Sequence, residues 1–184
     1  MLDTLGALLT ACLTISPLLG IDARQQAEMF AEAQRVWTLH GVTLREGERD
    51  NCDRLLVVKS DTEARAEDIA PGPALGWVPF VAGKARRVVF LRVARASVLT
   101  ADMSPGTRPD GLTRFLVGRL LGRVLAHEIG HILLGSAQHQ ANGLMRAQYQ
   151  ARDVLKSAPA SYTLDAGERA RLFAGGAEPR LARR

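Results

Sequence analysis

The chain has 184 residues, of which 47% are hydrophobic and 23% are charged. This length and composition fit a single globular domain with a sizeable core, so residues 1–184 are treated as one domain. The formal net charge of +5 comes from scattered Lys and Arg, without a basic patch interleaved with aromatic residues, and a nucleic-acid partner is therefore not expected. The densest basic cluster lies in residues 178–184, which we expect to form a flexible, solvated tail.

The first twenty residues are fairly apolar but contain Asp3 and no Lys or Arg. They lack the charged front end of a secretory signal and are too short and too interrupted for a membrane span. We expect residues 1–12 to be disordered or the remnant of a leader, and residues 13–18 to form the first strand. Cys12 and Cys52 could pair in an exported protein or remain two buried thiols, so the compartment stays open.

A helix is predicted to follow this first strand. Asp22, with Gln25 three residues later, is the signature of a capping box at a helix start. Apolar residues then recur at helical spacing as far as Trp37. Gly41 is the usual kind of terminator, so His40 is interpreted as a helix-end residue and not as a metal ligand.

Further strands are predicted at residues 42–45, 55–58, 74–81 and 87–93. The second of these is a continuous apolar run typical of an interior strand, and the strand–helix–strand order up to that point indicates a crossover unit. The third contains Gly76 and Pro79, which suit the edge of a sheet because proline cannot donate to a ladder. Residues 94–111, with two prolines and two glycines, are predicted to be a linker.

A long helix is predicted from residue 112 or 113 to residue 134. It is apolar on most faces, so it should be buried against the sheet. Gly118 and Gly122 would permit close packing. Three arginines interrupt it and exclude a membrane span.

The end of this helix has the pattern of a zinc site. Three of the four histidines in the chain are His127, His131 and His139. Residues four apart share a helix face, so His127 and His131 can bind one ion, and Glu128 can reach a water on the metal without being a ligand. In this H-E-x-x-H arrangement the Glu is the general base of a hydrolase. A catalytic zinc needs a third ligand, and His139 can supply it because Gly135 is well placed to end the helix and let the chain turn back.

A lone histidine on an apolar helix is more often a core residue than a ligand. Two histidines with an intervening Glu are harder to explain in this way, because three titratable groups on one buried helix are costly without a shared partner.

The run H-E-x-x-H-x-x-x-G-x-x-x-H-x-x-x-G-x-M, from His127 to Met145, resembles the metzincin clan of zinc peptidases. The usual metzincin spacing would place Gly and His where this chain has Leu134 and Ala137, so the loop here is two residues longer. The resemblance covers residues 126–145 well and the rest of the chain only loosely.

The resemblance implies an α+β fold in which a twisted, mixed sheet of four to five strands packs on a backing helix and on a central H-E-x-x-H helix. It also implies a C-terminal helix, for which residues 164–173 are the candidate, after a short helix at residues 149–155. The whole chain would then be one zinc-peptidase-like catalytic domain.

The implied activity is that of a zinc metalloendopeptidase with one catalytic Zn²⁺ and a peptide or protein substrate. Met145 would support the site as a Met-turn, and Tyr149 would contact the oxyanion or the substrate. The edge strand would pair with extended substrate backbone through Leu75, Gly76, Trp77 and Val78. The alternative for this stretch is a plain edge strand with a solvent-facing Trp77.

Two other functions stay open. One is a zinc peptidase of the regulatory, repressor-cleaving type, whose third ligand would be a downstream carboxylate such as Asp153 or Glu168. The other is a non-catalytic, zinc-stabilised binding domain. Glu128 counts against the latter, because a structural zinc site normally closes with a fourth protein ligand and needs no general base.

Overall fold

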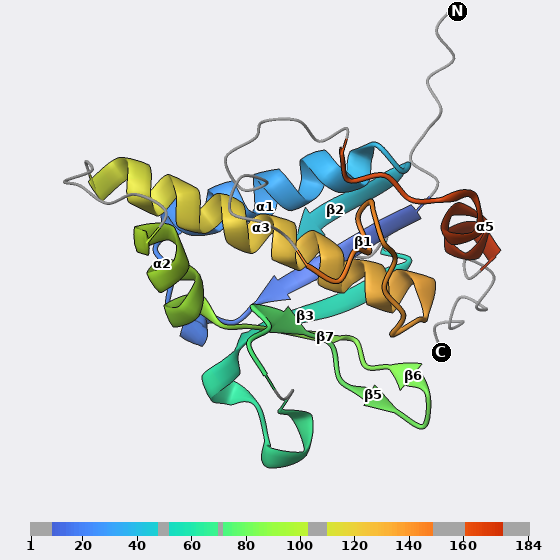
Figure 1. The fold of residues 1–184 in the computed structure, drawn as a ribbon, viewed down its shortest axis with the longest axis horizontal. Coiled ribbons are helices and arrows are strands. Elements are labelled where there is room, and N and C mark those ends of the chain that lie inside the picture. Colours follow the sequence, from blue (N-terminus) through green and yellow to red (C-terminus); the bar gives the residue numbers. More distant parts are fainter. Residues whose placement is uncertain (1–8, 48–51, 70–71, 103–109, 149–160, 175–184) are drawn as a thin grey trace, which may run out of the picture.

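The computed structural model describes residues 9–47, 52–69, 72–102, 110–148 and 161–174 (Figure 1). The strands are β1 (Leu9–Ile15), β2 (Val42–Glu46), β3 (Arg54–Ser60), β4 (Gly76–Trp77), β5 (Phe80–Val81), β6 (Lys84–Ala85) and β7 (Val88–Leu91). The helices are α1 (Ala23–Thr38), α2 (Val93–Asp102), α3 (Asp110–Leu134) and α5 (Ala166–Ala174), with short 3-10 turns at η1 (Pro17–Leu19), η2 (Asp61–Glu63) and η3 (Ala66–Asp68).

Five of the strands form one mixed sheet in the order β2–β1–β3–β7–β4. The first four run parallel, and β4 pairs antiparallel with β7 at the edge of the sheet. Parallel neighbours need a crossover connection, which α1 supplies between β1 and β2. The α+β class, the mixed five-stranded sheet, the crossover unit and the edge position of β4 are therefore confirmed.

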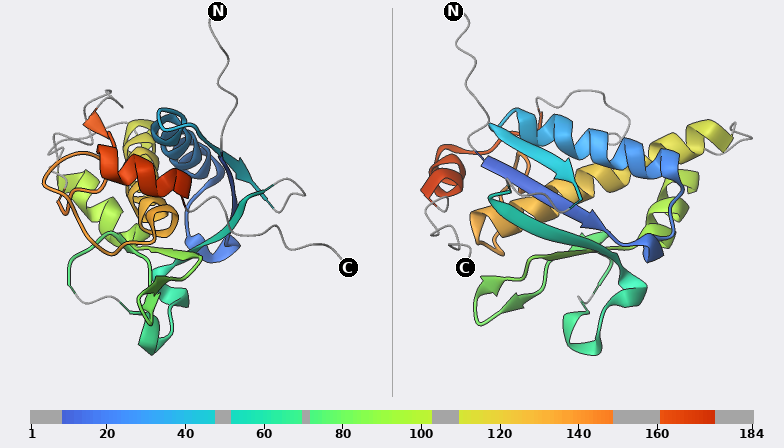
Figure 2. Two further views of the ribbon diagram at one scale, coloured as in Figure 1. Left: turned by 90° about the vertical axis from the view of Figure 1, so that its right-hand side faces the viewer. Right: turned by 180° about the vertical axis from the view of Figure 1, so that it is seen from behind.

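Helices α1 and α3 lie side by side across one face of the sheet (Figures 1 and 2). Two glycines of α3 allow their backbones to approach. A Cβ at Gly118 would lie 2.7 Å from the Gln25 oxygen, and one at Gly122 would lie 2.5 Å from the Met29 oxygen. Both distances are too short for a real side chain, which confirms the predicted close packing and shows that α3 packs against α1.

Helix α1 begins and ends as the sequence indicates. Asp22 accepts from the Gln25 backbone N–H, and the Gln25 side chain returns a bond to the Asp22 N–H, which completes the capping box. Near its other end, the Trp37 indole donates to the Ala126 carbonyl at 3.1 Å and ties α1 to α3. His40 follows the helix, and its Nε2 lies 2.8 Å from the Tyr162 carbonyl oxygen, so it is a helix-end residue as predicted.

Three predictions about the elements were wrong in part. The first strand begins at Leu9, so residues 9–12 belong to the sheet. The predicted linker contains α2, whose buried stripe consists of only Ala96 and Thr100, one helical turn apart. The predicted strand at residues 74–81 divides into β4 and the first strand of the β5–β6 hairpin, on either side of Val78 and Pro79.

The described chain ends in α5, which confirms a C-terminal helix close to the expected boundaries. Cys12 in β1 forms a disulfide with Cys52, just before β3, and their Cα atoms are 5.8 Å apart. Of the two predicted alternatives for the cysteines, the paired one is observed. Within the described ranges, no helix has the length and apolar character needed to cross a membrane.

Candidate metal centre

The first two histidines of the motif occupy the last turns of α3. His127 and His131 are one helical turn apart and are 7% and 5% exposed, in the half of α3 that is packed into the core. The helix ends at Leu134, and Gly135 follows with φ +59°, a conformation that favours glycine. The Ser136 N–H donates to the His131 carbonyl, which satisfies one of the carbonyls that a helix end exposes.

His139 returns to this helix after the glycine turn. Its ring centroid lies 5.2 Å from that of His127 and 4.9 Å from that of His131. The loop that carries it is closed on itself, because the Gln140 N–H donates to the Met145 carbonyl. Each of the three histidines offers a nitrogen within 4.8 Å of the other two, and among the described residues this is the cluster that could hold a metal ion.

The hydrogen bonds of the two helix histidines orient them as ligands. His127 Nδ1 lies 2.8 Å from the Leu144 carbonyl oxygen, and His131 Nδ1 lies 2.7 Å from the Ser136 carbonyl oxygen. A carbonyl only accepts, so each Nδ1 carries the proton and each Nε2 carries a lone pair. Metal-ligating histidines are usually oriented by such bonds.

The two Nε2 atoms then face each other at 3.1 Å, although both are acceptors. A shared cation removes this conflict. Two nitrogens bound tetrahedrally to one zinc at about 2.0–2.1 Å would be about 3.3 Å apart. The spacing of these two nitrogens therefore fits one zinc ion, and a nitrogen of His139 lies within 4.8 Å of both.

The two helix histidines, His127 and His131, are also in the protonation state that metal binding requires. Burial, together with the neighbouring His131, lowers the pKa of His127 to about 3. Burial likewise lowers the pKa of His131. Both rings are therefore neutral at pH 7 and can act as ligands without first losing a proton.

Glu128 lies beside the histidines and is 6% exposed. Burial raises its pKa to about 8, because removal from solvent penalises the charged carboxylate. The side chain lines the same cavity as all three histidines. A cation held by the histidines would lower this pKa and leave Glu128 as a carboxylate at neutral pH.

Met145 supports the cluster from below. It is 1% exposed and packs against Gly130, between the two helix histidines, where a Cβ would overlap its sulfur. The turn that holds it is fixed by the Leu144 N–H, which donates to the Thr163 carbonyl. Gly143, with φ +79°, lies against the same carbonyl, where a side chain would clash. Met145 thus lies against the helix between His127 and His131, and its role as a Met-turn stays a prediction.

The cluster opens into a cavity of about 920 Å³. One wall consists of the predicted edge-strand residues Leu75, Gly76, Trp77 and Val78. The strand approaches Glu128 so closely that a Cβ at Gly76 would lie 3.2 Å from the Glu128 Cγ. The alternative prediction of a solvent-facing Trp77 is wrong, because this side chain is 7% exposed, stacks on Phe90 and lies under Arg92.

Tyr149 and Asp153 lie outside the described residues, as does the predicted helix at residues 149–155. Glu168 lies away from the histidine cluster, where its carboxylate accepts from the Asp165 N–H at the start of α5. Sequence reasoning missed Tyr162, which is 1% exposed and lines the cavity. The only signal for it was an isolated aromatic residue just before the C-terminal helix.

No protein-family model matches the chain, and no curated protein matches it in sequence.

Proposed function

We propose that this chain is a zinc-dependent, metzincin-like metalloendopeptidase. The observation that carries the proposal is the placement of three histidine nitrogens and a buried carboxyl, Glu128, in one cavity beside an edge strand. A structural zinc site has four protein ligands and no adjacent base, whereas a catalytic site has three ligands and an open position.

His127 and His131 would hold the ion through Nε2, with their rings oriented by the Leu144 and Ser136 carbonyls, and His139 would complete the set. When bound, zinc supplies a Lewis acid that acidifies water towards a pKa of about 7 and polarises a carbonyl oxygen.

Glu128 would carry the proton through the reaction. Its carboxylate accepts a proton from the attacking water as the water oxygen bonds to the peptide carbon. It then donates that proton to the leaving nitrogen as the C–N bond breaks. Burial of Glu128 favours this second step, because a poorly solvated carboxyl holds its proton until an acceptor is in place.

A peptide substrate is supported by the neighbourhood of the site. Strand β4 forms one wall of the cavity and, of the described strands, pairs only with β7. Its other edge can take an extended segment as an additional strand, with main-chain hydrogen bonds that do not depend on sequence. The cavity beside it has room for side chains of such a segment.

The test is zinc content by elemental analysis together with peptidase activity, on the wild type and on Glu128→Gln. We expect near-stoichiometric zinc in both proteins and hydrolysis of an unstructured protein substrate by the wild type alone. Zinc without turnover in the wild type would reassign the chain as a non-catalytic zinc domain. Equal turnover by Glu128→Gln would refute the mechanism.

A further inference from the structure

Arg123 is a charged residue in the wall of the candidate active site. It precedes His127 by one turn of α3, a rise of about 6 Å along the helix. Its side chain lines the same cavity as His127 and Glu128, and the residue is only 2% exposed. A buried arginine so close to the reacting groups has a charge that is only weakly screened by solvent.

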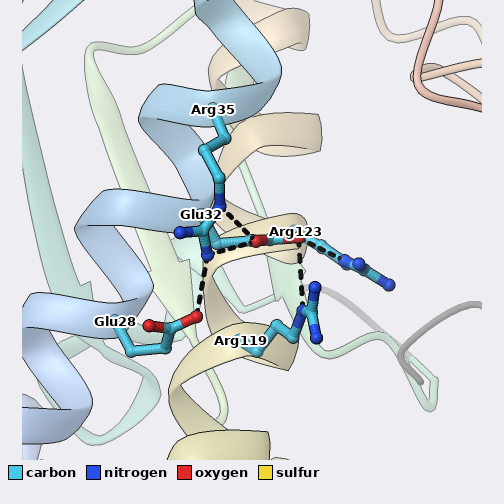
Figure 3. Close-up of polar contacts among 5 residues, drawn as sticks. All are labelled: Glu28, Glu32, Arg35, Arg119 and Arg123. Atoms are coloured by element: carbon cyan, nitrogen blue, oxygen red, sulfur yellow. Dashed lines mark hydrogen bonds and ion pairs between the residues drawn. The ribbon is translucent and has the colours of Figure 1, made fainter. Parts of the chain in front are cut away.

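Arg123 is fixed in place by Glu32 of α1 and by Tyr162. Its Nε donates to Glu32 Oε1 at 2.7 Å (Figure 3). Its guanidinium lies 5.1 Å from the centre of the Tyr162 ring. Burial alone would raise the pKa of Glu32, but hydrogen bonds from Arg123 and Arg35 outweigh it and lower the pKa. Glu32 is therefore a carboxylate that orients Arg123.

Glu32 forms ion pairs with more than one arginine. It also accepts from Arg35 at 2.5 Å and lies 3.7 Å from Arg119, while Arg35 reaches Glu28 at 2.8 Å (Figure 3). The five side chains of this group comprise two carboxylates and three guanidinium groups, so the group carries one net positive charge. Arg35 is 44% exposed and meets solvent, whereas Arg119 and Arg123 are 13% and 3% exposed.

A second arginine lines the same cavity. Arg146 directly follows Met145, on the loop that returns from the histidine cluster. The same cavity is also lined by the apolar residues Leu120, Val124 and Phe80. The cavity thus combines an apolar wall with two guanidinium groups near the candidate metal centre.

We propose that Arg123, together with Arg146, binds a carboxylate of the substrate, so that the enzyme prefers peptides with an acidic group close to the scissile bond. Guanidinium groups pair with carboxylates through two parallel hydrogen bonds, which gives both strength and direction. The carboxylate comes either from an Asp or Glu side chain next to the cleaved bond or from a free C-terminus. This inference rests on the proposed peptidase function.

The experiment compares peptides that differ only by Glu or Gln next to the scissile bond, placed first on one side of the bond and then on the other. Each peptide is made with a free and with an amidated C-terminus. For the zinc-loaded wild type we expect kcat/KM to be at least about 10-fold higher with Glu than with Gln, as one charge-assisted hydrogen-bond pair supplies. If the carboxylate is that of the C-terminus, the same preference separates the free from the amidated peptides.

We define the acidic preference as kcat/KM for the preferred acidic peptide divided by kcat/KM for its neutral counterpart. In Arg123→Gln this ratio should fall close to one. Arg35→Gln is the matched control, because Arg35 bonds the same Glu32 carboxylate but does not line the cavity. It should keep the wild-type ratio. Arg146→Gln, which leaves the bond between Glu32 and Arg123 in place, provides a second variant if Arg123→Gln fails to fold, and it should also lower the ratio.

Peptide binding separates failure of this inference from failure of the proposed function. Trp77 lines the cavity, so its fluorescence can report the Kd of each peptide for zinc-loaded Glu128→Gln protein. Hydrolysis without any acidic preference overturns the inference and leaves the peptidase intact. If no peptide is hydrolysed, the proposed function fails. The Kd values then decide the carboxylate site alone: tighter binding of acidic than of neutral peptides supports it, and equal binding refutes it.

Discussion

Met145 packs its sulfur against Gly130, which lies in α3 between His127 and His131 and directly precedes His131. The contact joins the turn that contains Met145 to the helix that carries His127 and His131. Because the Leu144 carbonyl accepts from His127, the same turn also orients one of the ligands. The position of the candidate centre therefore depends on a contact that only glycine permits.

Replacing Gly130 by Ala should destabilise the protein by about 1–3 kcal/mol, since the new Cβ overlaps Met145 in a packed interior. The measurement is urea unfolding of the zinc-free protein, with Met145→Ala as the partner variant. In the double variant the added methyl group occupies space that the methionine has left. The loss of unfolding free energy in the double variant should therefore be smaller than the sum of the losses in the two single variants. Additive costs would mean that the two residues are not in contact.

His139→Ala should weaken zinc binding by more than about 100-fold, because removing even an outer hydrogen-bond partner of a ligand costs about 10–100-fold. His139 is exposed, so the folded state should survive the change. The readout is zinc affinity in competition with a chelator. His40→Gln is the control, since His40 contacts Tyr162 and not the cluster. If His139→Ala binds zinc as tightly as the wild type does, the third ligand is not His139 but a carboxylate.

Much of the site could be predicted from sequence because its determinants are local. His127 and His131 share a helix face through the helical period, and Gly135 ends the helix through its backbone freedom. The spacing from Gly135 to His139 permits a return to the metal. Each of these relationships spans only a few residues, so it is visible without knowledge of the fold.

The features that were missed depend on contacts between distant segments. A solvent-facing Trp77 remained open as an alternative because the groups that cover it, Arg92 and the carbonyl of Asp68, come from other segments of the chain. Tyr162 enters the cavity only because its segment pairs with the turn before Met145. The helix α2 buries a stripe of two residues, which is too narrow a signal to outweigh the prolines and glycine that follow it.

The stability of the zinc-free protein should fall as the pH rises from about 6.5 to 8. The pKa of Glu128 is raised from 4.5 to about 8 in the folded state, so the folded protein holds a proton that the unfolded chain has released. The stabilisation is complete below pH 4.5 and is lost as the pH rises through 8. One proton over this window corresponds to about 2 kcal/mol of unfolding free energy.

The histidines affect stability mainly below this pH range. His127 has a lowered pKa of about 3, so below pH 6.5 the unfolded chain gains a proton that the folded protein does not, and stability falls as the pH falls. Above pH 6.5 this effect fades, because the unfolded histidine is by then losing its own proton. Urea unfolding at several pH values should show the alkaline slope in the wild type and not in Glu128→Gln. An unchanged slope in the variant would assign the titration to another group.

The disulfide between Cys12 and Cys52 should stabilise the fold without affecting the metal centre. It closes a loop with a sequence separation of 40, for which the loss of chain entropy in the unfolded state corresponds to about 4 kcal/mol. Cys12 lies in β1, in the interior of the sheet, and neither cysteine lines the cavity.

Reductant should therefore lower the urea midpoint of the wild type to that of the Cys12→Ala/Cys52→Ala double variant, which itself should not respond to reductant. Zinc affinity should be the same in all of these proteins, because α3 and the loop to Met145 carry the centre and neither is part of the closed loop. Equal midpoints of the wild type with and without reductant would contradict a stabilising disulfide. A loss of zinc affinity on reduction would instead show that the β1–α1–β2 unit transmits strain to the site through the contact between α1 and α3.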